Sequence, residues 1–150
     1  VLGYRMMEQE HIDKRIKNAA LMHHERFDGS GYPFGLKGER IDTFASIVSI
    51  ADVYDALTSD RCYRSAVCPF EVIAIFESHG LTEYNPKFIL TFLEHIAQTY
   101  IGNSVRLSDN RLGKISMIDT KNLLRPLIQL ESGEFVDLSK HLDLYVEEIV

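Results

Sequence analysis

Two adjacent histidines, His23 and His24, stand with Glu25 directly before a glycine-rich loop. Neutral imidazole is the commonest protein ligand for transition metals, and a neighbouring carboxylate can bind the metal or orient an imidazole. Adjacent side chains at a helix end point about 100° apart, so each ring could face its own metal, or one a metal and the other a substrate. On the dipeptide alone, however, a packed core histidine beside a solvated one is the more common arrangement.

The loop at residues 28–38 reads DGSGYPFGLKG and contains four glycines. Glycine lets the backbone approach a ligand closely, while Tyr32-Pro33 stiffens the middle of the loop. Glycine-rich loops are often simply turns, so the glycines alone are a weak signal. Their position directly after the paired histidines favours a ligand site.

An aspartate and two arginines extend the candidate site. Asp52 lies within the otherwise apolar run SIVSIADVYDAL at residues 46–57, and a buried carboxylate there must be paired, hydrogen-bonded or bound to metal. A hydrogen bond between helices is the alternative to a metal. Arg61 and Arg64, three residues apart, are ordinarily a solvated face, but their planar guanidinium groups could also form a cationic patch that suits phosphate.

The spacing of apolar residues predicts helices from Leu2 to about Gln98. A first helical stripe leads into the paired histidines, and a second, at residues 44–57, predicts a well-buried helix. A third helix is expected from Pro69, with Gly80 as its stop, and a fourth opens at Asn85-Pro86 with Asn85 as its cap.

After residue 100 the sequence becomes typical of strands. Short apolar runs at 105–107, 112–118, 127–130 and 135–138 are separated by turn residues at 108–110 and 131–134. We therefore expect a mainly α protein in which a helical domain at residues 1–100 is followed by a small antiparallel β subdomain at residues 101–150.

The composition, 45% apolar and 25% charged, is that of a globular protein able to bury a core. The net charge of −6 argues against binding a long nucleic acid, which needs many phosphates neutralised, but leaves a small anionic ligand open. Cys62 and Cys68 form neither a disulfide framework nor a zinc-ribbon spacing, so a reducing, cytoplasmic location is expected. We expect no membrane-spanning segment and no secretory signal.

Taken together, these segments resemble the HD-GYP family, bacterial metal-dependent phosphohydrolases that cleave the second messenger cyclic di-GMP. The resemblance is dense over residues 2–98. It rests on HHE at 23–25, DGSGYP at 28–33, IADVYDAL at 50–57, and Arg61 with Tyr63. It implies an HD-type helical bundle, of which this chain carries a part, while the likeness of the β tail to the short appendage often found after this domain is weaker and implies no chemistry.

The resemblance also implies roles for single residues. His23 and His24 match the paired histidines that ligate the metal centre, and Asp52 matches the aspartate that closes it. The positions that contact substrate and its phosphates match Tyr32, Arg61 and Arg64, the last being often lysine in the family. Divalent iron or manganese is expected, two ions in the complete domain, because histidine and carboxylate ligands without sulfur suit such ions. A metal-activated water would then attack phosphorus, with no protein nucleophile.

One departure is large. The His-Asp dipeptide of the family name does not occur in the 150 residues, and the chain opens on Val1 in a stretch that looks like the one after another ligand histidine. We therefore expect a C-terminal part of the domain that binds metal weakly and has no turnover by itself.

Two alternatives to an enzyme stay open: a degenerate domain that binds cyclic di-GMP or a protein without hydrolysis, and an interaction module that docks through the GYP loop. Homo-oligomerisation is also expected, because the helices at residues 3–20 and 44–57 carry wide apolar faces.

Overall fold

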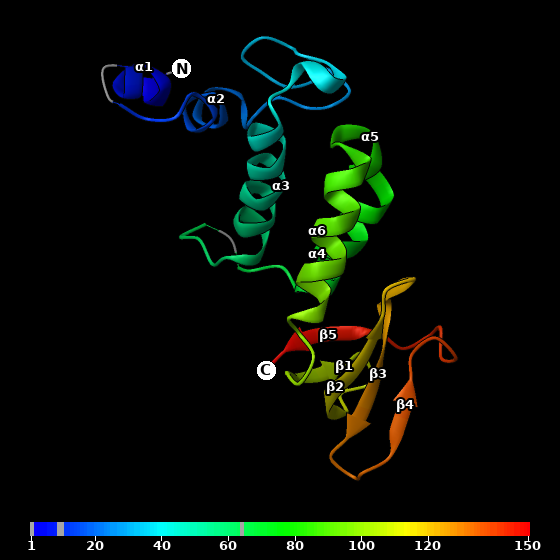
Figure 1. Cartoon of the computed structure of the whole chain (residues 1–150). Coiled ribbons are helices and arrows are strands. Elements are labelled where there is room, and N and C mark those ends of the chain that lie inside the picture. The colour runs from blue at the N-terminus through cyan, green and yellow to red at the C-terminus, as the bar shows by residue number, and fades with distance from the viewer. Residues whose placement is uncertain (1, 9–10, 64) are drawn as a thin grey trace. The chain divides into compact units, whose positions relative to one another are not determined.

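In a computed structural model, which describes residues 2–8, 11–63 and 65–150, helices come first along the chain and a sheet follows (Figure 1). This confirms the α-then-β order. The chain forms two compact units, one of Val1–Ser59 with Phe76–Leu90 and the other of Asp60–Ile75 with Thr91–Val150. The domain boundary at residue 100 stays a prediction.

The first helical stripe is divided between two helices, α1 (Leu2–Glu8) and α2 (Lys14–Met22), so the expectation of one stripe running unbroken to the histidines is wrong. Asp13 explains where α2 begins, because its side chain accepts a hydrogen bond from the backbone N–H of Arg15 at 2.8 Å. The Arg15 side chain also bonds this carboxylate and lowers the pKa of Asp13 to about 2. The cap is therefore charged at neutral pH, and α2 ends where His23 begins the site.

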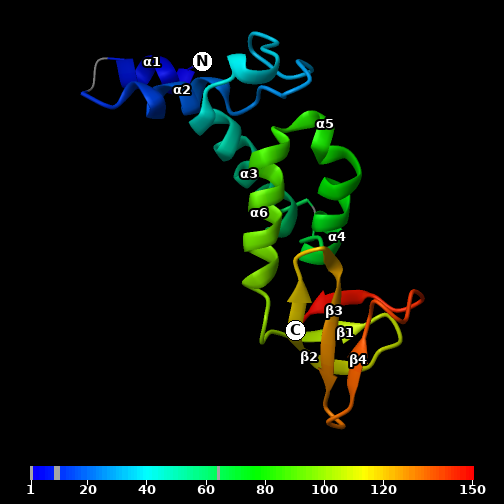
Figure 2. The same ribbon diagram turned by 45° about the vertical axis from the view of Figure 1, so that its right-hand side comes forward.

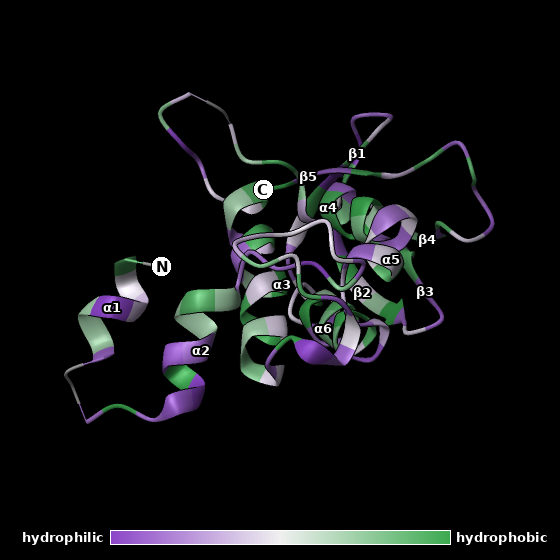
Figure 3. Cartoon of the chain, turned by 90° about the horizontal axis from the view of Figure 1, so that it is seen from above, coloured by the Kyte–Doolittle hydropathy of each residue, from purple (hydrophilic) through white to green (hydrophobic). Residues whose placement is uncertain are grey.

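The second predicted helix is present as α3 (Thr43–Thr58), with Asp42 as its N-cap. Its buried face consists of Ala45, Ser49, Ile50 and Tyr54. The opposite face is exposed and carries an apolar part, because the side chains of Phe44, Ile47 and Val48 are 44%, 47% and 41% accessible. The prediction of a well-buried helix is therefore wrong for one side of α3. Figure 3 shows the ribbon of this helix largely in white and green.

The helix expected from Pro69 to Gly80 changes geometry on the way. It starts as α4 (Pro69–Ile75), continues as the π-helix η2 (Phe76–Gly80) and is followed by α5 (Leu81–Glu83), so Gly80 does not stop it. A Cβ at Gly80 would lie 3.2 Å from side-chain atoms of both Ile89 and Phe76, so this glycine allows close packing instead.

The predicted Asn85 cap is confirmed. Its side-chain oxygen accepts a hydrogen bond from the N–H of Lys87 at 3.0 Å. Helix α6 (Pro86–Gln98), which starts here, is labelled in Figure 2.

The β residues form one antiparallel sheet in the order β4-β3-β2-β1-β5. Its strands are β1 (Ser104–Leu107), β2 (Leu112–Asp119), β3 (Asn122–Leu130), β4 (Phe135–Asp137) and β5 (Val146–Ile149). The sequence analysis missed β5, and it began β3 too late because Arg125-Pro126 was taken as a lead-in. Pro126 is accommodated where the pairing of β2 with β3 shifts register between Met117 and Asp119.

The second unit has its own core. Alternating residues of the strands are buried on one side of the sheet, among them Val105, Leu107, Ile115 and Ile128. Helix α4 contacts both β3 and β5. The sheet and the short helix together therefore bury enough apolar surface to hold this unit together.

Replacing Gly113 with Ala is expected to destabilise the sheet by about 1–3 kcal/mol, because a Cβ there would lie 2.7 Å from Gln129 O and from an Ile128 methyl. Urea unfolding measures the loss. The matched control is Gly3→Ala in α1, where a Cβ meets nothing within 4 Å and should cost nothing. Equal stability of both variants would contradict the close approach of β2 and β3.

Candidate metal and ligand site

His23 occupies the C-cap of α2, and the backbone sets its ring. Its Nδ1 lies 3.0 Å from the carbonyl oxygen of Ala19, one helical turn earlier. When Nδ1 carries the proton and donates it to that oxygen, Nε2 keeps its lone pair. His23 is therefore oriented as a metal-ligating histidine is, with one nitrogen anchored and the other available.

His24 lies against His23, with ring centroids 4.1 Å apart and the ring planes tilted by 46°. Both side chains are half-buried, so the arrangement of one packed and one solvated histidine does not occur. Burial lowers the pKa of His24, and the neighbouring His23 lowers it further, while the Asp52 carboxylate acts in the opposite direction. The result is a neutral imidazole at pH 7, the form that binds metal.

Tyr32 lies on the other side of His24. The two rings are stacked, with centroids 4.7 Å apart and 28° between their planes. The backbone N–H of Tyr32 also donates to the carbonyl oxygen of His24 at 3.2 Å. The structure thus brings together three of the predicted site residues, in the order His23, His24, Tyr32.

Asp52 is less enclosed than expected. Its side chain is exposed, so the premise that this carboxylate is buried is wrong. The reason is helical periodicity, which places Asp52 with Val48 and opposite the buried residues of α3. The pKa of His24 is lowered overall, but the negative charge of Asp52 acts against this lowering. Asp52 therefore lies close enough to that ring for an electrostatic interaction.

Arg61 and Arg64 are the two arginines of the predicted site. Arg61 is exposed and belongs to the second compact unit, whereas the histidines belong to the first. Arg64 lies outside the described residues. Their predicted contact with substrate phosphates stays a prediction.

Glu25 has partners that the sequence analysis did not expect. It is 2% exposed, and its carboxylate accepts hydrogen bonds from the backbone N–H groups of Phe34 at 2.7 Å and Leu36 at 2.8 Å. Both oxygens therefore bond the glycine-rich loop, a role different from binding a metal or orienting an imidazole. An acidic residue directly before a loop with many free N–H groups was the available signal.

Arg26 connects the loop region to the rest of the first unit. Its guanidinium donates to the hydroxyl of Ser49 on α3 at 2.8 Å and lies 5.0 Å from the centre of the Tyr84 ring. Close by, the N–H of Phe27 donates to the carbonyl of Glu83 at 2.7 Å. The segment that follows the histidines is thus fixed against two other parts of the unit.

A family model described as HD domain matches residues 1–88, which are more than half of the chain. The chain belongs to the HD domain family. The match covers every site residue described in the first unit, and it confirms the resemblance to HD-GYP proteins drawn from the motifs.

Curated relatives of this HD domain are named for cyclic dinucleotides. A cyclic di-GMP phosphodiesterase of Pseudomonas aeruginosa is 35% identical over 85% of this chain and 31% of its own length. The cyclic di-GMP phosphodiesterase response regulator RpfG of Xanthomonas campestris is 44% identical over 53% of this chain and 21% of its own. A 3′3′-cGAMP-specific phosphodiesterase of Vibrio cholerae is 55% identical over 35% of this chain and 12% of its own. The chain thus spans a third or less of these relatives.

HD domains generally bind divalent metal ions. Two half-buried imidazoles, one of them kept neutral and the other with Nε2 available, are suitable donors for such an ion. Among the described residues no group of three or more His, Cys, Asp or Glu side chains is arranged to hold a metal. The histidine pair therefore fits one edge of a metal site, and Asp52 does not close it in this arrangement.

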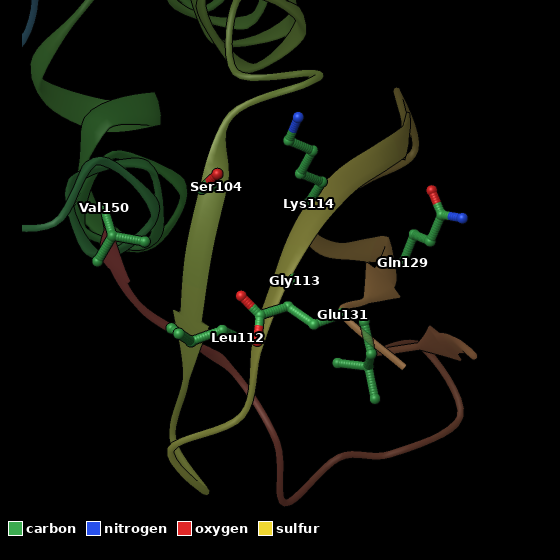
Figure 4. A pocket seen from close by; sticks show the side chains of 8 residues that line it. Ser104, Leu112, Gly113, Lys114, Gln129, Glu131 and Val150 are labelled. Carbon is green, nitrogen blue, oxygen red and sulfur yellow. The ribbon is translucent and has the colours of Figure 1, made fainter. Parts of the chain in front are cut away.

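Two hollows of the surface lie in other parts of the sequence. One of about 440 Å³ lies on the sheet of the second unit, with Lys114 and Gln129 on neighbouring strands (Figure 4). Another of about 480 Å³ is bordered by α4 and β5 and includes Cys68, whose pKa is raised by burial. Of the predicted site residues that the structure describes, none lines either hollow.

In the part of the chain that the structure covers, no helix is both long and apolar enough to cross a membrane.

Proposed function

We propose that the protein is a metal-dependent phosphodiesterase that hydrolyses cyclic di-GMP, and that its helices belong to an HD-type bundle. The observation that carries the proposal is the ring cluster at the HHE and GYP motifs, in which neutral His24 lies against His23 and stacks on Tyr32. It places a potential metal ligand directly against an exposed aromatic ring, which a nucleobase or sugar can contact. The names of the relatives support the same substrate class.

In this proposal His23, His24 and Asp52 are metal ligands, and two iron or manganese ions complete the centre. Bound metal would supply Lewis-acid activation of the attacking water. The chain contributes the orientation of the two imidazoles, through Ala19 O for His23 and through Tyr32 for His24. The exposed position of Asp52 would let its carboxylate reach a metal from α3 without first breaking a buried hydrogen bond.

The direct test is turnover by the full-length protein, loaded with Mn²⁺ or Fe²⁺ under reducing conditions. Release of the linear dinucleotide or of GMP from cyclic di-GMP, abolished by a chelator and restored by metal, is expected. A metal-loaded protein without turnover would contradict the enzyme function.

A second substrate has a specific observation in its favour, because relatives are named as specific for 3′3′-cGAMP. The stacking of Tyr32 on His24 offers a planar surface, which accepts either purine. Competition between the two dinucleotides in one reaction would rank them by kcat/KM.

Binding without hydrolysis is the second candidate function. Its support is that no cluster of three metal ligands occurs among residues 2–8, 11–63 and 65–150. Stoichiometric binding of cyclic di-GMP by metal-free protein, with no product after metal loading, would establish a binding module instead of an enzyme.

Replacing Arg61 with Ala is expected to weaken cyclic di-GMP binding about ten- to a hundredfold, because a charged phosphate contact is worth about 1.5–3 kcal/mol. Isothermal titration of the full-length protein measures the change. Arg40→Ala is the matched control, since Arg40 is an exposed arginine in the short helix η1 (Gly38–Arg40). Unchanged affinity of the Arg61 variant would show that this side chain does not hold a phosphate.

A further inference from the structure

We propose that Glu25 is a positioning residue: its buried carboxylate fixes the loop of residues 28–38 and thereby holds the Tyr32 ring on His24. Packing gives the middle of the loop little support, because Tyr32, Pro33, Phe34 and Gly35 are all exposed. Exposed residues gain little from packing, so hydrogen bonds must supply the order.

The carboxylate holds the loop at two points just beyond Tyr32-Pro33. One oxygen of Glu25 accepts from Phe34 N at 2.7 Å and the other accepts from Leu36 N at 2.8 Å. Hydrogen bonds that backbone N–H groups donate to a charged acceptor are shorter and stronger than those donated to a neutral acceptor. A buried carboxylate also requires such partners, since an unsatisfied one is costly. The loop and Glu25 therefore stabilise each other.

Two further contacts transmit this anchor to the Tyr32 ring. Tyr32 N donates to His24 O, so the chain before Pro33 is tied to the residue that precedes Glu25. At Gly31 the backbone comes so close that a Cβ would lie 2.3 Å from Arg26 N and 2.5 Å from His24 O. With Phe34 held on the other side, the tyrosine has little freedom except to lie over His24.

The same geometry separates the roles of the three motif residues at 23–25. His23 and His24 keep their rings for metal and for Tyr32, while Glu25 points its carboxylate into the loop. The effect of Glu25 on substrate binding rests on the function proposed above. If Tyr32 contacts the dinucleotide, Glu25 lowers the KM by keeping that ring in place before substrate arrives.

The first test needs no ligand. The chain has no tryptophan, so Tyr32→Trp in the full-length protein, or in a version freed of other tryptophans, gives a single fluorescent reporter of the loop. Adding Glu25→Gln is expected to raise acrylamide quenching of this reporter at least about twofold, because the NH2 group that replaces one carboxylate oxygen cannot accept a hydrogen bond from the backbone N–H that this oxygen held. Glu94→Gln, at an exposed position of α6, is the matched control and should leave quenching unchanged.

Hydrogen exchange of the unmodified protein keeps the proposal testable should Glu25→Gln fail to fold. The amide protons of Phe34 and Leu36 are expected to exchange at least about tenfold more slowly than the amide of Lys37 in the same exposed loop. Equal exchange rates, or a folded Glu25→Gln variant with unchanged quenching, would overturn the anchor.

A double-mutant cycle separates positioning from general stability. Glu25→Gln is expected to raise the KM for cyclic di-GMP about tenfold with bound metal unchanged, and to have no further effect in a Tyr32→Ala background. Additive effects would show that Glu25 does not act through Tyr32. Absence of cyclic di-GMP turnover by the unmodified protein would instead reject the proposed function, while the quenching and exchange results would still decide the anchor.

Discussion

Replacing His24 or Asp52 with Ala is expected to abolish cyclic di-GMP turnover by the full-length protein and to lower its metal content. Removing His24 takes away a neutral imidazole and also the surface on which Tyr32 stacks. Removing Asp52, which lies on α3, takes away the carboxylate whose charge acts on the pKa of His24. Losing one ligand of a metal centre removes the group that activates water, so a fall in kcat of at least about a thousandfold is expected.

Metal analysis and single-turnover assays on the same samples test this expectation. His95→Ala and Glu94→Gln are matched controls, because both residues are exposed on α6 and match no part of the motifs. Full metal content with normal turnover in the Asp52 variant would remove this residue from the ligand set. The same result for His24 would leave the histidine pair without a metal role.

The part of the site that lies close together in the chain could be predicted from sequence. His23, His24 and Tyr32 are within ten residues of one another, so a helix end and a tight loop suffice to bring them into contact. Asp52 shows the limit of that reasoning. Its apolar neighbours suggested burial, but the side of a helix that is covered depends on what packs against it, and the spacing of residues does not contain that information.

Glu25 shows a different limit. Sequence reasoning considered that it binds the metal or orients an imidazole, because carboxylates and imidazoles are often found together. Its partners are backbone N–H groups nine and eleven residues later, and the sequence does not specify which backbone groups come to lie beside a side chain. Only the path of the loop reveals that both carboxylate oxygens bond these two groups.

The fold was predicted where local signals decide the structure. Asn85 caps α6 as predicted, and the apolar run from residue 44 predicted α3, although its cap Asp42 was not foreseen. Gly80 was misjudged because glycine has two uses, ending a helix or allowing close packing, and only the neighbours Phe76 and Ile89 distinguish them. Strand β5 was missed because Val146–Ile149 contains two adjacent glutamates and pairs with β1, some forty residues earlier.

Self-association at micromolar concentration is expected for this chain, with the exposed apolar face of α3 as the contact. Phe44, Ile47 and Val48 lie on one side of the helix and are each more than 40% accessible. Burying about 1,000 Å² between two copies at about 25 cal/mol per Å² contributes about 25 kcal/mol. Association costs about 4–15 kcal/mol in lost freedom of motion, so the surplus is sufficient for a dimer.

Light scattering measures the mass of the chain, 17.2 kDa for a monomer. Val48→Glu is expected to shift the protein to monomer, because a charge buried in an apolar contact without a partner is strongly unfavourable. Thr43→Glu is the matched control at an exposed position in the first turn of the same helix, where an added acidic group is tolerated or favourable. If the unmodified chain is already a monomer that unfolds cooperatively, the α3 face is stable in water and does not join two copies. If both variants remain dimeric, the copies meet through another surface, and exchange of the helices on either side of the glycine-rich loop becomes the arrangement to test.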